Sequence, residues 1–223
     1  LRKRGFEVTE LPVDREGRIS MELLERAIRP DTVLLSIMCA NNEIGTLQDM
    51  EAIGGIAQRR GIIFHTDAVQ AYGQIPIDVK KWHVHMLSAS SHKFYGPKGC
   101  GFLYMKQGLR TESMIHGGAQ ESGRRAGTEN VPGIVGMAKA AQLAFAHMDE
   151  TMERETWMRD RMIHHICSEI PGAFLVGSLT ERLPGNLNIC FPGIQASNLV
   201  LLLDEAGICV TAGSACNTSE AAP

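Results

Sequence analysis

Residues 32–67 read TVLLSIMCANNEIGTLQDMEAIGGIAQRRGIIFHTD, and they alternate between strand and helix patterns. Residues 32–38 form an apolar run of strand length, which is typical of a parallel strand that is covered on both faces. A helix is predicted over residues 50–60, with Asp49 as its N-cap. A second buried strand follows over residues 61–67. This strand, helix, strand order predicts an α/β fold with a mostly parallel mixed sheet flanked by helices, where ligand groups gather at the strand ends.

The N-terminal region extends the alternation. Residues 6–13 alternate apolar and polar side chains, which predicts a strand. Ser20 is a suitable N-cap for a short helix that ends at Ile28. Later in the chain, residues 132–165 carry apolar side chains at helical spacing and then a charged stretch, which predicts one long helix or two joined helices.

The pattern changes after these helices. Short strands are predicted at residues 174–176 and 188–191, and a helix at residues 197–205. We therefore expect two domains: residues 1–145 form most of the larger one, and residues 146–223 form part of a smaller α+β domain. The sequence begins at a leucine and stops just after a loop, so we expect a fragment that lacks both ends of a longer chain.

Composition excludes several classes of protein. The chain has 223 residues, of which 44% are hydrophobic, and a net charge of −3. These values suit a soluble protein with a sizeable core and suggest no nucleic-acid partner. No apolar run approaches the roughly 20 residues needed to span a bilayer, and no signal peptide is visible. The six cysteines include no C-x-x-C pair, which favours reduced thiols in the cytoplasm and argues against a zinc site.

One lysine stands out in residues 88–101, SASSHKFYGPKGCG. Lys93 follows a short apolar strand and precedes a glycine-rich turn, so we expect it on a loop at the end of a strand, where α/β sheets bind ligands. A lysine amine in such a place can form a Schiff base with an aldehyde cofactor, of which pyridoxal phosphate is the obvious candidate. Taken alone, a solvated loop lysine would be the commoner interpretation.

Further motifs occur in a recognisable order. They are NNEIGTLQD from residue 41, HTDAVQAYGQIPIDV from residue 65, HGGAQESGRRAGTENVPGIVG from residue 116, and GSACNTS from residue 213. Together with the lysine segment, they resemble cysteine desulfurases of the NifS/IscS kind, which belong to the class V aminotransferase family of pyridoxal phosphate enzymes. The resemblance covers essentially the whole chain. It implies that residues 1–145 belong to the large domain of the type I fold of these enzymes.

The resemblance also implies roles for residues of the cofactor site. Lys93 would hold pyridoxal 5′-phosphate covalently and would move the Cα proton of the substrate. Asp67 would keep the pyridine nitrogen protonated, and Gln70 would bind the phenolic oxygen of the cofactor. Ser90 and His92 would donate to the phosphate, which favours several convergent donors.

Two further positions come from the same resemblance. Asn42 would lie close to both the ring oxygen of the cofactor and the carboxylate of the substrate. Thr128, in RRAGTEN, would reach the phosphate of the neighbouring subunit, which makes a homodimer necessary. His65 ends a strand, and a histidine in such a place is more often structural, so we leave it out of the catalytic set.

Cys216 lies in a run of small residues that offers nothing to anchor a core, so we expect an exposed thiol. It matches the persulfide cysteine of the NifS/IscS group. The hypothesis includes a transient iron–sulfur ligand role for Cys216, and no metal site is assigned. The other five cysteines stand among apolar residues or beside strands, and we expect them to be inert packed thiols: Cys39, Cys100, Cys167, Cys190 and Cys209.

The resemblance predicts the removal of sulfur from L-cysteine, which gives alanine and a persulfide on Cys216 for an iron–sulfur scaffold protein or another acceptor. The alternatives are a selenocysteine lyase or aminotransferase on the same fold, or a non-catalytic partner subunit. The family's ring-stacking histidine and its phosphate-binding turn are expected upstream of Leu1. Its arginine for the substrate carboxylate is expected downstream of Pro223.

Overall fold

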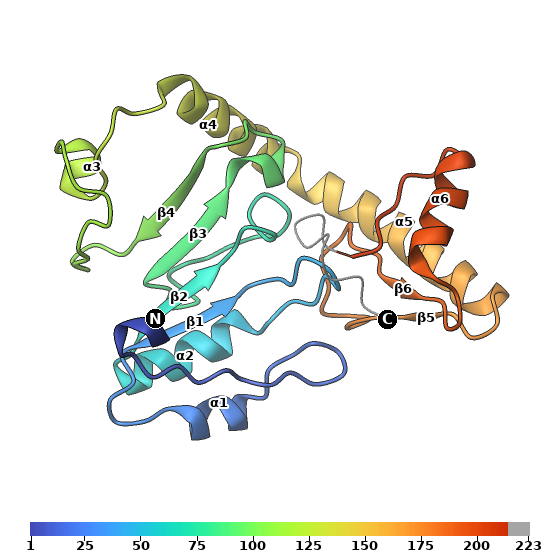
Figure 1. The fold of residues 1–223 in the computed structure, drawn as a ribbon, viewed down its shortest axis with the longest axis horizontal. Helices are drawn as coiled ribbons and strands as arrows, with labels where there is room; N and C mark the ends of the chain where they lie inside the picture. Colours follow the sequence, from blue (N-terminus) through green and yellow to red (C-terminus); the bar gives the residue numbers. More distant parts are fainter. Residues whose placement is uncertain (214–223) are drawn as a thin grey trace.

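The computed structural model describes residues 1–213, and its main feature is one four-stranded sheet (Figure 1). The strand order is β1-β2-β3-β4. The first three strands are parallel and β4 runs antiparallel. The prediction of an α/β fold with a mostly parallel sheet is therefore confirmed. The sheet strands are β1 (Leu34–Met38), β2 (Ile63–Asp67), β3 (Met86–Ser90) and β4 (Gly101–Met105).

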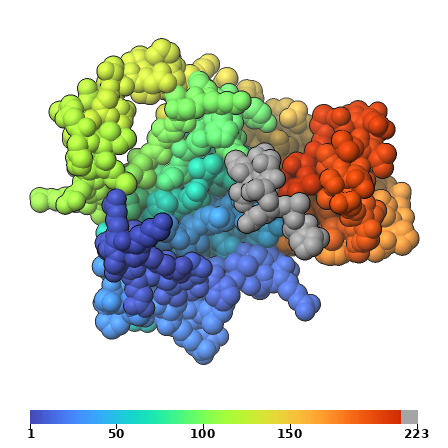
Figure 2. Space-filling view, viewed as in Figure 1, coloured from blue at the N-terminus to red at the C-terminus, as the bar shows by residue number. Residues whose placement is uncertain are grey.

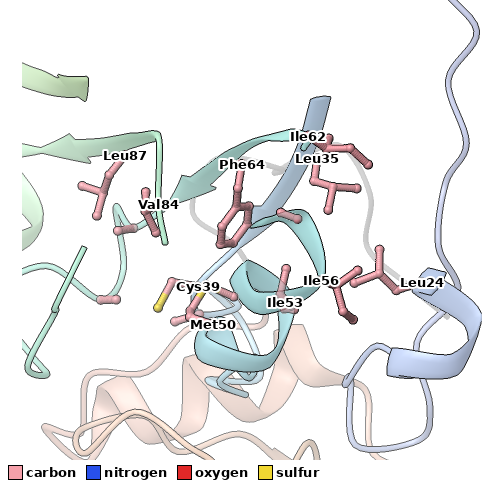
Figure 3. Close-up of a cluster of buried hydrophobic side chains, with 14 of the residues drawn as sticks. Leu24, Leu35, Cys39, Met50, Ile53, Ile56, Ile62, Phe64, Val84 and Leu87 are labelled. Atoms are coloured by element: carbon pink, nitrogen blue, oxygen red, sulfur yellow. The ribbon is translucent and has the colours of Figure 1, made fainter. Parts of the chain in front are cut away.

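Helices α1 (Met21–Ala27) and α2 (Met50–Arg60) build the core against one face of this sheet. Phe64 of β2 and Ile53 of α2 are both fully buried, and Figure 3 shows them at the centre of the apolar cluster. Leu24 of α1 lies beside Ile56 of α2 in the same view. Burying one such side chain contributes about 1.5–3 kcal/mol, so this layer is a main source of the sheet's stability.

The predicted ends of α2 are confirmed. Asp49 is the N-cap, because its side chain accepts a hydrogen bond from the backbone N–H of Ala52. Gly61 ends the helix in the left-handed conformation with a φ of 66°. The shorter helix α1 begins as predicted, since the Ser20 side chain accepts from the N–H of Leu23.

The predicted strand over residues 6–13 is wrong. The structure has no strand there, and the one pairing found in this part of the described chain is an isolated bridge between Val13 and Ile19. Alternation of side chains predicts a strand only if a neighbouring strand supplies hydrogen bonds. None lies beside this segment within the described residues, and Phe6 is 55% exposed.

Two joined helices follow the sheet, as one of the two alternatives predicted. They are α4 (Val131–Ala146) and α5 (Met148–Glu169), and His147 separates them. A small antiparallel pair, β5 (Phe174–Leu175) with β6 (Ile189–Cys190), and helix α6 (Ala196–Glu205) come next. The helix break falls beside the predicted domain boundary at residue 146, but the division into two domains stays a prediction. The remaining short elements are η1 (Arg2–Arg4), η2 (Ser91–Phe94) and α3 (Gln120–Gly123).

Within the described residues, no helix is both long enough and apolar enough to cross a membrane.

Candidate functional site

The carboxyl ends of the three parallel strands meet at one edge of the sheet. Met38 of β1 pairs with Asp67 of β2, and Asp67 pairs with Ser88 of β3. Backbone bonds continue past the strand ends, since Cys39 N–H donates to the Asp67 carbonyl at 2.8 Å and Ala68 N–H donates to the Ser88 carbonyl at 2.9 Å. Side chains that follow these strands are therefore held at a common edge, where open α/β sheets bind ligands.

Lys93 lies at this edge, in the short 3-10 helix η2 that directly follows β3. The turn is anchored on both sides of the lysine, because Ser91 is fully buried and Phe94 is 2% exposed. Tyr95 ends the turn with a φ of 65°, and the N–H of Gly96 donates to the Ser91 carbonyl at 2.9 Å. Lys93 itself is half-buried. Its backbone is thus fixed on both sides at the edge of the sheet and does not lie on a free loop.

Helix α4 packs behind the lysine turn, and two glycines allow the close approach. A Cβ at Gly96 would lie 2.0 Å from the hydroxyl of Ser91 and 3.3 Å from the Cβ of Ala140 on α4. A Cβ at Gly136 of α4 would lie 2.7 Å from a ring carbon of Pro97. The glycine-rich pattern around Lys93 is therefore a packing requirement as well as a turn signal.

Ser90 and His92 are brought together beside the lysine. The Ser90 hydroxyl lies 2.9 Å from Nδ1 of His92, whose ring is exposed. Asp67 ends β2 on the neighbouring strand and is also exposed, and its Oδ1 accepts from the N–H of Val69 at 2.9 Å. One carboxylate oxygen is thereby used to hold the carboxylate, and within residues 1–213 the other accepts no hydrogen bond from the protein.

Two more predicted residues lie on the loops that follow these strands. Asn42 is exposed in the turn after β1, where Asn41 Oδ1 accepts from the N–H groups of Glu43 and Ile44 at 2.9 and 3.0 Å. Gln70 is half-buried in the turn after β2. Both belong to the same edge of the sheet as Lys93.

Thr128 is not brought to this edge. It is exposed within residues 106–130, a segment whose hydrogen bonds join mostly its own members, such as Gly127 N–H to Oε1 of Gln120 at 3.1 Å. Figure 2 shows this segment (yellow-green) projecting at the left of the molecule. Within the described chain, Thr128 forms no hydrogen bond with another predicted site residue. Cys216 lies outside the described residues.

His65 has a position that sequence reasoning missed. Its Nδ1 lies 2.8 Å from the Ser36 hydroxyl of β1, and its Nε2 lies 2.8 Å from the Ser88 hydroxyl of β3. The imidazole thus joins all three parallel strands. Partial burial lowers its pKa, and the carboxylate of Asp67 opposes that shift. The signal in the sequence was the spacing, because residues two apart on a strand share a face, so His65 lies on the face of Asp67.

The described cysteines divide by burial. Cys39 is 1% exposed, and burial raises the pKa of its thiol to about 12, with a smaller contribution from Asp67. The expectation of an inert packed thiol is therefore confirmed for Cys39. It is wrong for Cys209, which is exposed just after α6, where no described segment packs over it. The remaining three are half-buried: Cys100, Cys167 and Cys190.

Comparison with known proteins gives a consistent family. The aminotransferase class-V family model matches residues 1–222. The chain is 52% identical over 223 residues to a protein of Methanosarcina thermophila named "Cysteine desulfurase IscS", and this match covers all of the chain and 55% of that protein. A protein of the same name from Dictyoglomus turgidum is 48% identical, with 57% of its length covered. The chain thus spans little more than half the length of these relatives.

Solved structures agree with the sequence matches. A structure named "NIFS-LIKE PROTEIN" superimposes with a TM-score of 0.89 at 40% identity, covering 94% of this chain and 57% of the other. A second, described as "SspA in complex with cysteine", gives a TM-score of 0.80 at 36% identity and covers 97% of this chain and 59% of that one. The fold is therefore that of the NifS-like structures.

Proposed function

The chain belongs to the class-V aminotransferase family, and on that premise we propose that its protein is a cysteine desulfurase that uses pyridoxal phosphate to take sulfur from L-cysteine. The observation that carries the proposal is the placement of Lys93. It lies in an anchored turn after β3, and β3 pairs with the strand that Asp67 ends. The names of the relatives at 48–52% identity support the same reaction.

The donor set at the strand edge fits pyridoxal phosphate. The Ser90 hydroxyl and the His92 ring lie within 2.9 Å of each other, which suits an anion that accepts from several donors. The free oxygen of Asp67 is available to a protonated ring nitrogen, and the half-buried Lys93 supplies the amine. Bound there, the cofactor would supply an electron sink for the bonds at the substrate Cα.

We assign the remaining steps to residues of this chain. Nζ of Lys93 takes the proton from Cα of the substrate and later returns a proton. Asn42 orients the substrate carboxylate, and Gln70 binds the phenolic oxygen of the cofactor. The Cys216 thiolate attacks the substrate sulfur, so that a sulfur–sulfur bond forms as the carbon–sulfur bond breaks. L-cysteine and the thiol of Cys216 thus become L-alanine and a persulfide on Cys216.

The proposed partners follow from the product. A persulfide is passed on by thiol exchange, so we propose an iron–sulfur scaffold protein or another sulfur acceptor as the recipient. We propose a homodimer in which Thr128 of one subunit reaches the phosphate of the other, a role that suits its exposed position on residues 106–130. The five described cysteines are free thiols, which favours the cytoplasm.

The decisive experiment compares full-length protein with its Cys216→Ser and Cys209→Ser variants. With L-cysteine, the unsubstituted protein should form one alanine for each persulfide. Mass spectrometry should find one extra sulfur atom on the peptide that contains Cys216. Cys216→Ser should bind the cofactor normally and form no persulfide. Cys209→Ser, which removes another exposed thiol, should keep near-normal activity. Wild-type sulfur release by Cys216→Ser would overturn the proposal and favour a lyase.

A further inference from the structure

The turn that carries Asn42 is held by a segment far away in the sequence. Residues 176–188 run beside residues 41–47, and Figure 1 shows the loop after β1 reaching the part of the chain that contains β5 and β6. The backbone contacts are Leu183 N–H to the Gly45 carbonyl at 2.9 Å and Leu47 N–H to the Glu181 carbonyl at 2.9 Å. Residues of the proposed small domain thus set the shape of a turn at the proposed active site.

Two asparagine amides of this segment converge on one carbonyl of the turn. Nδ2 of Asn186 donates to the Glu43 carbonyl at 3.1 Å, and Nδ2 of Asn188 donates to the same oxygen at 3.3 Å. The approach is so close that only glycine fits at residue 45, where φ is 71° and a Cβ would lie 2.4 Å from the Asn186 side chain. The Glu43 carbonyl belongs to the peptide between Glu43 and Ile44, one residue beyond Asn42. It lies inside the turn that the Gly45 N–H closes by donating to the Asn41 carbonyl at 3.1 Å, so holding this carbonyl holds the turn that carries Asn42.

A buried arginine orients the first of these amides. Arg182 is only 4% exposed, and within residues 1–213 it forms no ion pair with a carboxylate. Its guanidinium donates to backbone carbonyls of Ser178 and Val176, and its Nη1 donates to Oδ1 of Asn186 at 2.8 Å. Burial lowers the pKa of Arg182, with a further contribution from Arg159. Burying a charge without a counter-charge is costly, so this arrangement requires that its hydrogen bonds be satisfied.

The chemistry of the two side chains determines which way the amide points. A guanidinium offers only donors, so it must face the oxygen of the Asn186 amide. The NH₂ of Asn186 is then directed at the Glu43 carbonyl and cannot turn away without leaving two donors facing each other. Asn188 lacks such support from Arg182, although it donates to the same carbonyl.

We propose that Arg182 and Asn186 are positioning residues for Asn42: the buried guanidinium fixes the Asn186 amide, which fixes the turn that presents Asn42 to the substrate carboxylate. The inference rests on the proposed function for the role of Asn42. Neither residue touches substrate. They act through the Glu43 carbonyl and connect the part of the chain after α5 to substrate binding.

The test uses Asn186→Asp in full-length protein. Aspartate still accepts from Arg182 but cannot donate to the Glu43 carbonyl, which it also repels. Amide hydrogen exchange in residues 43–47 should quicken about tenfold, the factor for one ordinary hydrogen bond, in protein without cysteine. Exchange in β3 and η2 should stay unchanged. The matched control is Asn198→Asp on α6, the same chemical change at an exposed amide that bonds only within its own turn.

A double-variant cycle separates positioning from a general structural role. Asn186→Asp should raise KM for L-cysteine about tenfold with kcat within about twofold, whereas in an Asn42→Ala background it should add less than about twofold. Unchanged exchange at residues 43–47 would overturn the proposal, and so would fully additive effects on KM. If the unsubstituted protein did not convert L-cysteine at all, the proposed function would be wrong. The proposed role of Asn42 in binding the substrate carboxylate would then be wrong as well. The exchange result would then still decide whether Asn186 holds the turn.

Discussion

The hydroxyl of Ser88 on β3 lies 2.8 Å from Nε2 of His65 on β2. The other ring nitrogen has a matching bond to Ser36 on β1, so one neutral imidazole, with one donor and one acceptor, joins three parallel strands just before they reach the ligand edge. Because Asp67 ends the same strand, the histidine stabilises the part of the sheet from which Asp67 projects.

Acidification should lower the stability of the folded protein through His65. Burial lowers the pKa of His65 in the folded protein, so below its ordinary pKa of 6.5 the unfolded state binds a proton that the folded state resists. Stability therefore falls as pH drops through that region. His65→Gln should lose about 1–2 kcal/mol at pH ~7.5, for two hydrogen bonds, and should show a smaller further loss at pH ~5.5. Urea unfolding at both pH values measures this.

The control for that experiment keeps the imidazole. Ser88→Ala removes one of its two hydrogen bonds, so it should cost about 1 kcal/mol at pH ~7.5 and retain the loss on acidification. If His65→Gln and the unsubstituted protein fell equally between the two pH values, His65 would not be the titrating group.

Two adjacent glycines of α2 should respond in opposite directions to the same change. A Cβ at Gly54 would lie 1.7 Å from the backbone carbonyl oxygen of Trp82, which cannot swing aside. Gly54→Ala should therefore destabilise the protein by more than about 2 kcal/mol, through displacement of the helix from the turn that contains Trp82.

At Gly55 the nearest atom to such a Cβ is the flexible end of Arg59, at 3.5 Å. Gly55→Ala should stabilise the helix by about 0.5–1 kcal/mol, because alanine loses less entropy than glycine on forming a helix. Urea midpoints of the two variants are the measurement. A stable Gly54→Ala would show that α2 does not pack this closely against the turn that contains Trp82.

Thiol reactivity should follow burial among the described cysteines. The pKa of Cys39 is raised to about 12 by burial, so almost no thiolate forms at pH 8, whereas Cys209 is exposed. Iodoacetamide at pH ~8 should modify the Cys209 peptide rapidly and the Cys39 peptide only after unfolding, by more than about 100-fold in rate. Mass spectrometry of the two peptides checks this. Comparable rates in the folded protein would contradict the buried position of Cys39.

Features that depend on neighbours in the sequence were predictable, and those that depend on distant partners were not. The ends of α2 follow from Asp49 and Gly61, which act within four residues of themselves. The bonds of His65 join residues 23 and 29 positions away, and Asn186 reaches Glu43 across 143 positions. No local pattern encodes such pairs. The strand predicted over residues 6–13 was wrong for the same reason. A strand needs a neighbouring strand as its partner, and the alternation of side chains does not show whether one is present.

The candidate site divides in a similar way. The alternation of strands and helices in the sequence predicts Asp67 and Lys93 at one edge, since parallel strands end together, and Ser90 comes from the family resemblance. Thr128 was assigned through the family resemblance alone, and its role stays a prediction that a single chain does not test.

The last prediction concerns the lysine itself. Three lysines lie near the glycine-rich turn. Lys93 is half-buried, whereas Lys98 and Lys106 are exposed. Ser91 and Phe94 anchor the turn on either side of Lys93, so its amine should be the one that bonds the aldehyde of pyridoxal phosphate.

Borohydride reduction of the yellow full-length protein should fix one pyridoxyl group on the peptide that carries Lys93. Lys98→Arg should be labelled as well as the unsubstituted protein, whereas Lys93→Arg should lose the label and bleach on gel filtration. Recovery of the pyridoxyl group on Lys98 or Lys106 would refute the assignment, because an exposed lysine is not held against the edge where Asp67 lies.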